Sequence, residues 1–175
     1  GGGTAAPEPV DVAAVPQQSA AYAHLPVRGY KSFETGATEQ GLGKIVAKAR
    51  EFNSTLTTNL TTEEIGPTLD ALCQTLAATN RYHASKVSDE ELAAVGKMVR
   101  HWDAERVFPA LDLARLLAVH PDAATSRREA FWTEVVAAAL ATCKEEVSGT
   151  AAVAVPMLTM RLCANCFKGG VGSAK

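Results

Sequence analysis

Apolar residues recur every three or four positions along most of this chain, and that spacing predicts helices rather than strands. The first such segment covers about residues 38–53. Two later segments open with the capping-box pattern, in which a serine or threonine is followed three residues later by glutamate: Thr61 with Glu64, and Ser88 with Glu91. No stretch shows the alternation of a half-buried strand that would compete with this pattern. We therefore expect an all-α chain.

Three further helical segments fill the second half of the sequence. Pro109 opens one of them, because proline fits the first turn of a helix. Another begins at about 125–126, and the last runs over about 150–167, where Pro156 should kink the helix or mark its true start. About six helices result. A bundle and a solenoid are both compatible with that number, but nearly continuous apolar residues favour stacked layers, as in an armadillo-like α-solenoid.

The N-terminal region has a different composition. Residues 1–24 consist mainly of Gly, Ala, Pro, Gln and Ser, which is typical of a flexible linker. The stretch that follows carries Leu25, Val27, Tyr30 and Phe33, which we expect to lie extended over a helical surface. Because the chain starts with glycine rather than methionine, we expect it to be part of a longer protein.

Composition and charge exclude several classes of function. The 175 residues are 47% hydrophobic and carry a net charge of −2, with no basic stripe interleaved with aromatic residues, so nucleic-acid binding is not expected. No window resembles the roughly 20 apolar residues of a membrane span, and no apolar leader opens the chain. We expect a protein of the cytoplasm, and of the nucleus as well, that does not bind membranes.

Cysteines and histidines give little sign of catalysis. Cys163 and Cys166 have redox-motif spacing but lie towards the end of an apolar helix, and Cys73 and Cys143 are isolated, so we interpret the four as buried structural cysteines. The four histidines lack metal-ligand spacing and lie near loops or helix ends, so we expect most of them to face solvent or to lie at a helix C-terminus, where a cation suits the helix dipole. No phosphate-binding loop or nucleophile elbow occurs. We expect no enzymatic activity, no metal and no cofactor.

Arg115 is the most informative single residue, because it lies among leucines in the segment RVFPALDLARLLAVHP. Its guanidinium must reach the edge of the helix or meet a carboxylate. One interpretation is a structural ion pair with Asp112, three residues earlier. The other is an anion-binding arginine on a concave surface.

Three motifs occur in an order that resembles the PUL domain of phospholipase-activating-protein-type ubiquitin adaptors. They are LPVRGYKSFET with the helix that follows it, FPALDLARLLAVHP, and MRLCANCFKGGVG. The resemblance covers residues 25–175 and implies an armadillo-like domain that binds the C-terminal tail of the valosin-containing AAA ATPase, in support of ubiquitin-dependent degradation and ubiquitin homeostasis. A complete PUL domain is longer, so we expect only its N-terminal half here.

The resemblance also implies a binding site. In that family, a groove with basic residues receives an acidic peptide tail, and the arginine of the family's FPxLDLxR motif falls on Arg115. Arg161 and Lys168, in the last motif, are the other candidate partner-binding residues. Ubiquitin itself would be bound only by domains outside this chain.

Two alternatives stay open. PUL domains also occur fused to papain-like (PPPDE) isopeptidase and thioredoxin domains, and the catalytic cysteine and histidine would then lie outside this chain. Alternatively, the chain is a helical scaffold that binds another partner through an apolar groove.

Overall fold

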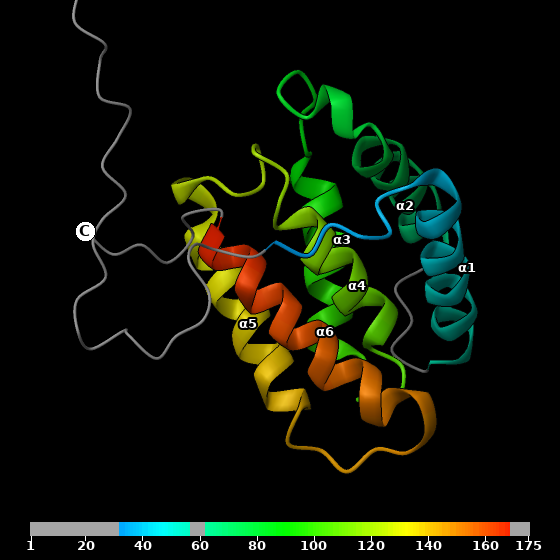
Figure 1. Cartoon of the computed structure of the whole chain (residues 1–175). Coiled ribbons are helices and arrows are strands. Elements are labelled where there is room, and N and C mark those ends of the chain that lie inside the picture. Colours follow the sequence, from blue (N-terminus) through cyan, green and yellow to red (C-terminus); the bar gives the residue numbers. More distant parts are fainter. Residues whose placement is uncertain (1–31, 57–61, 169–175) are drawn as a thin grey trace, which may run out of the picture.

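The computed structural model describes residues 32–56 and 62–168, and within these ranges all regular structure is helical (Figure 1). The six helices are α1 (Glu39–Thr55), α2 (Thr62–Ala77), α3 (Asp89–His101), α4 (Phe108–Leu117), α5 (Glu129–Thr142) and α6 (Gly149–Lys168). Short 3-10 turns, η2 (Thr79–Arg81) and η3 (Ser126–Arg128), precede α3 and α5. The predicted all-α, armadillo-like class is confirmed. The linker predicted over 1–24 lies outside the described residues.

Local sequence signals account for several helix starts. At α3, the Glu91 amide donates to Ser88 Oγ at 3.1 Å and the Ser88 amide donates to Glu91 Oε2 at 2.7 Å, so both bonds of the predicted capping box are present. Pro109 lies in the first turn of α4, as predicted. Thr61, the residue expected to cap α2, lies outside the described residues.

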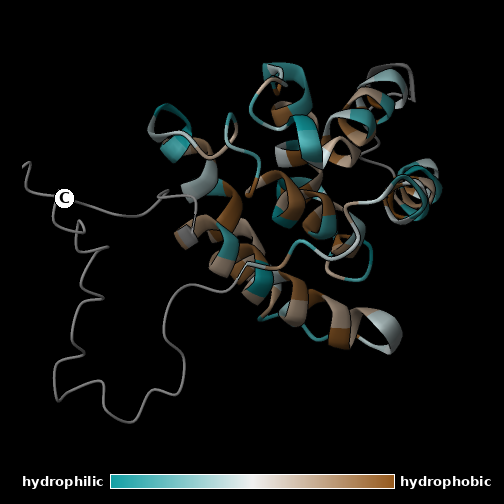
Figure 2. Cartoon of the chain, turned by 45° about the horizontal axis from the view of Figure 1, so that its top comes forward, coloured by the Kyte–Doolittle hydropathy of each residue, from teal (hydrophilic) through white to brown (hydrophobic). Residues whose placement is uncertain are grey.

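Helix α4 lies at the centre of the fold, in contact with α1, α3 and α6 (Figure 1). Every residue from Pro109 to Leu117 except Asp112 is buried. Around it, α1 packs on α2, α2 on α3, α3 on α5, and α5 on α6, so the helices form stacked layers. The apolar sides of the helices meet inside the stack (Figure 2). Burial of this apolar surface is the main force that holds the layers together.

Two prolines lie inside helices of the structure. Pro67 lies five residues after the start of α2. Pro156 lies inside α6, which begins at Gly149, so of the two alternatives given for it the helix start is excluded, and the kink stays a prediction. The Pro156 side chain is exposed, and at such a position a proline removes one backbone hydrogen bond without disturbing a packed neighbour.

Helix α6 is long and apolar enough over Gly149–Phe167 to cross a membrane by length and composition alone, contrary to the expectation that no window resembles a span. One side of it packs on α4 and α5, and this side carries its buried apolar residues Ala151, Val155, Leu158, Leu162 and Cys166. A helix in the core of a globular protein can have the same length and apolar composition. Packing therefore accounts for the apolar residues on that side of α6.

His120 is fully buried, whereas His83 and His101, the other two histidines in the described part of the chain, are exposed as expected. Its Nδ1 accepts a hydrogen bond from the Asp122 amide at 3.2 Å, and its Nε2 lies 2.9 Å from Ser85 Oγ. The Tyr82 ring packs against the imidazole with 4.6 Å between ring centres. Burial lowers the pKa of His120, so the imidazole is held neutral between two loops.

The cysteines divide by environment. Cys166 is buried, Cys73 and Cys163 are half-buried, and Cys143 is exposed; all four are free thiols. The interpretation as buried structural cysteines is therefore correct for Cys166 and wrong for Cys143, which follows the last residue of α5. Within the described part of the chain, no group of three or more potential metal ligands is found.

Candidate peptide-binding site

Residues 32–37, here called the strap, cross α4 and α6 before the chain enters α1 (Figure 1). Phe33 is fixed to α6 by a reciprocal pair of hydrogen bonds. Its amide donates to Asn165 Oδ1 at 2.8 Å, and its carbonyl accepts from Asn165 Nδ2 at 3.1 Å. The expected extended segment over a helical surface is confirmed at Phe33. Leu25, Val27 and Tyr30 lie outside the described residues.

Arg115 holds the strap from the side of α4. Its Nη1 donates to the Phe33 carbonyl and its Nη2 to the Thr35 carbonyl, each at 2.8 Å. Its Nε donates to Asp112 Oδ1 at 2.5 Å, so the predicted ion pair is present. With 4% of its surface exposed, Arg115 is buried under the strap. Its role in binding a partner stays a prediction.

Asn165 joins the three elements, and the sequence reasoning missed it. Besides its two bonds to Phe33, its Nδ2 donates to the Arg115 carbonyl at 2.7 Å, so one fully buried amide links α4, α6 and the strap. Asn165 follows Leu158 and Leu162 at helical spacing, on the buried side of α6. A polar residue within that apolar row was the available sequence signal, because a buried polar side chain needs hydrogen-bond partners.

Arg161 lies at the edge of the same region. Its guanidinium carbon is 5.6 Å from the centre of the Phe33 ring, in cation–π geometry. Among the described residues, it forms no salt bridge with a carboxylate. The structure thus brings Arg115 and Arg161 together through Phe33. Lys168 is the last residue of α6, seven residues after Arg161, and its side chain is outside the part of the chain that the structure describes.

A second basic region, also missed by the sequence reasoning, lies at the start of α3. Arg100, Arg127 and Arg128 line a cavity of about 650 Å³ together with Phe131. Each arginine is paired with a carboxylate of the chain; the partners are, in the same order, Glu134, Asp122 and Asp89. The adjacent pair Arg127–Arg128 was the only local signal. These pairs offset much of the positive charge around the cavity, although Asp122 is shared between Arg127 and Lys86.

The PUL domain family model matches residues 25–174. No curated protein and no solved structure matches the chain. The matched range contains the strap, all six helices and the three candidate binding residues. PUL domains are helical protein-interaction modules rather than catalytic ones. This chain belongs to the PUL domain family.

Proposed function

We propose that this chain docks the acidic C-terminal tail of the valosin-containing AAA ATPase, as the PUL module of an adaptor in ubiquitin-dependent protein degradation. The observation that carries the proposal is Arg161, a cation with no carboxylate partner among the described residues, placed over the ring of Phe33. Membership of the PUL family supports a protein partner. The tail supplies the carboxylates that Arg161 lacks within the described part of the chain.

The contact of Arg161 with Phe33 suits it to this role. A guanidinium resting on an aromatic ring loses little further freedom on binding, and its edge can donate two parallel hydrogen bonds to one carboxylate. Lys168, the last residue of α6, adds a second positive charge to the C-terminal half of this helix. An extended acidic peptide can therefore lie along the C-terminal half of α6.

Arg115 acts differently in this proposal. Its guanidinium is occupied by Asp112 and by the strap carbonyls, so it positions Phe33, which in turn supports Arg161. Replacement of Arg115 should weaken tail binding indirectly, by loosening the strap. Replacement of Arg161 should remove the direct contact.

Fluorescence-anisotropy titration with an acidic C-terminal peptide of the ATPase tests the proposal. Charge-assisted hydrogen bonds contribute about 1.5–3 kcal/mol, so Arg161→Ala should weaken binding roughly 10- to 100-fold. Arg127→Ala, in the other basic region, should leave affinity unchanged. If Arg127→Ala weakens binding and Arg161→Ala does not, the site at α6 is wrong. If the folded wild-type chain does not bind, the proposed partner is wrong.

A further inference from the structure

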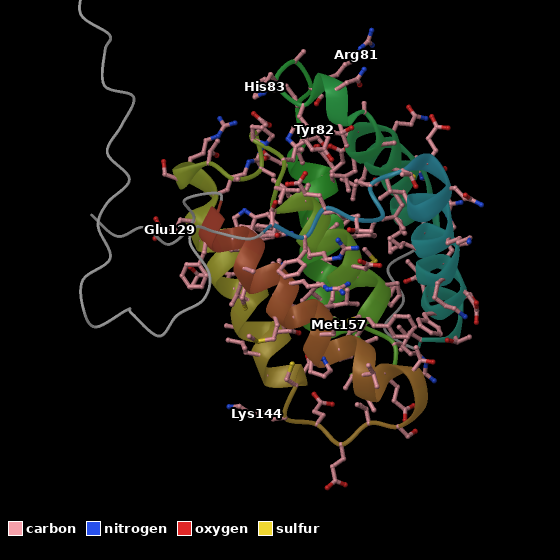
Figure 3. All side chains as sticks on the ribbon, viewed as in Figure 1. Arg81, Tyr82, His83, Glu129, Lys144 and Met157 are labelled. Atoms are coloured by element: carbon pink, nitrogen blue, oxygen red, sulfur yellow. The ribbon has the colours of Figure 1, made fainter. Side chains whose placement is uncertain are left out.

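The cavity at the start of α3 is lined by three arginine side chains that tail binding at α6 does not use. Arg100 comes from α3, and Arg127 and Arg128 come from η3, just before Glu129, which Figure 3 labels. The cavity has a volume of about 650 Å³, and Phe131 forms part of its wall. It is here called the arginine cavity. Since the whole chain has a net charge of −2, three arginines around one cavity are a local concentration of positive charge.

Arg128 is the fixed cation of the arginine cavity. Only 13% of its side chain is exposed, and its Nη2 donates to the Val87 carbonyl at 3.1 Å. Its carboxylate partner, Asp89, is 2.8 Å away but 91% exposed, so solvent screens this pair on the side of the carboxylate. The Arg128 Nε is buried and has no hydrogen-bond partner among the described residues. Arg128 is therefore a preorganised guanidinium whose exposed counter-ion can be replaced by an anion from outside.

Arg127 supplies the second guanidinium. Its Nη2 lies 3.6 Å from Asp122 Oδ1, which is longer than a hydrogen bond. Asp122 already accepts hydrogen bonds from the Val87 amide at 3.0 Å and from Lys86 Nζ at 3.1 Å. With 69% of its side chain exposed, Arg127 can turn towards an anion without leaving a buried position. The guanidinium groups of Arg127 and Arg128, on adjacent residues, can thus bind the same anion.

These contacts favour a phosphate monoester over a carboxylate. Each of the three arginines already faces a carboxylate of the chain, so a carboxylate from outside would exchange like for like. A phosphate monoester carries a charge of about −1.5 to −2 at pH 7 and has three acceptor oxygens, so it can bridge two guanidinium groups at once. Such a dianion therefore gains more in this cavity than a single carboxylate does.

The wall of the arginine cavity indicates what carries the phosphate. Phe131 packs so closely on Gly96 that a Cβ at residue 96 would lie 2.7 Å from the ring, and Leu92 and Ala93 line the cavity beside it. The exposed large apolar residues in the described part of the chain lie on α5 and α6, and none of them lines this cavity, so no side chain here is placed to enter a bilayer. A segment of a partner protein therefore fits the cavity better than a lipid headgroup.

We propose that the arginine cavity binds a phosphoserine of a partner protein. Arg128 and Arg127 hold the phosphate, and the wall around Phe131 holds an apolar side chain next to the phosphoserine. Because this wall adjoins the arginines, the phosphate must sit on a short side chain for a neighbouring residue to reach the wall. Binding replaces the exposed Asp89 and leaves the hydrogen bond from Arg128 to Val87 in place. The site uses other elements than Arg161 does, so it is independent of tail binding at α6.

Amide chemical shifts of the isotope-labelled chain, titrated with a blocked Ala-Leu-phosphoserine-Leu-Ala peptide, test this proposal. Saturable shifts should appear around the cavity, at Ser88, Asp89, Arg127 and Arg128. Arg127→Ala should raise the dissociation constant at least about tenfold, because a charge-assisted hydrogen bond is lost. Arg81→Ala removes the same charge from another exposed turn and should leave the constant unchanged. Since both side chains are exposed, circular dichroism should show native helix content in both variants.

Three control ligands decide the class of ligand. The same peptide with glutamate in place of phosphoserine, and inorganic phosphate at the same ionic strength, should each bind several-fold more weakly. Equal binding of the glutamate peptide would overturn the preference for phosphate, and equal binding of inorganic phosphate would overturn the assignment to a protein segment. Co-sedimentation with vesicles that contain phosphatidylinositol phosphates, if Arg127→Ala abolishes it, would overturn that assignment as well. The absence of saturable shifts at millimolar phosphopeptide, or an affinity unchanged in Arg127→Ala, would overturn the site itself.

Discussion

Asn165→Ala is the most direct perturbation of the link between the strap and the helices. The substitution removes three hydrogen bonds, two with Phe33 and one with the Arg115 carbonyl, all made by a fully buried side chain. At roughly 0.5–1.5 kcal/mol for each net hydrogen bond, the expected loss of unfolding free energy is about 2–4 kcal/mol. The Phe33 amide also loses its acceptor, so its hydrogen exchange should accelerate.

Urea denaturation followed by circular dichroism measures the loss of stability, and hydrogen exchange reports on the strap itself. Thr159→Val is the matched control, because Thr159 lies on the same helix with 1% of its surface exposed. Its hydroxyl has no hydrogen-bond partner among the described residues. The control should therefore be neutral or more stable by about 1 kcal/mol. An Asn165→Ala variant within about 0.5 kcal/mol of the wild type, with unchanged exchange at Phe33, would refute the reasoning.

Three further predictions concern other parts of the fold. Burial lowers the pKa of His120, so on acidification the unfolded chain binds a proton at this histidine near pH 6.5, before the folded chain does. The free energy of unfolding should therefore fall as the pH drops below about 6.5. Urea midpoints measured across this pH range should depend less on pH in His120→Gln than in the wild type. Burial raises the pKa of Cys166 to about 12, so iodoacetamide should modify exposed Cys143 first, and mass spectrometry that finds Cys166 labelled faster would contradict the packing. Gly36 has φ +102°, so Gly36→Ala should lower the thermal midpoint at a cost of about 1 kcal/mol, and an unchanged midpoint would disprove the need for glycine there.

The helices could be predicted from the sequence because their signals are local. Apolar spacing and the Ser88–Glu91 capping box act within a few residues, and both reappear in the structure. The ion pair between Asp112 and Arg115 was also predictable, since the two residues are one turn apart. Pro156 misled because an exposed proline can be accommodated inside a long helix.

The candidate site was harder to predict because its contacts join distant parts of the chain. The strap carbonyls bound by Arg115 lie 80 and 82 residues away from it in sequence, and the bond between Phe33 and Asn165 spans 132 residues. The family resemblance pointed to Arg115, but it did not indicate the strap whose carbonyls Arg115 binds. The polar Asn165 in the apolar row of α6 was a local signal of a buried hydrogen bond, but it did not indicate that the side chain would join the strap to α4.

Binding of the acidic tail at Arg161 is tested most directly by a single anisotropy experiment at moderate salt. A labelled C-terminal peptide of the valosin-containing ATPase is titrated with the wild type, Arg161→Ala and Arg81→Ala, the last on an exposed turn away from α6 (Figure 3). The account predicts saturable binding that is weakened roughly 10- to 100-fold in folded Arg161→Ala and is unchanged in Arg81→Ala. Equal binding by all three proteins, or no binding by the folded wild type, would contradict it.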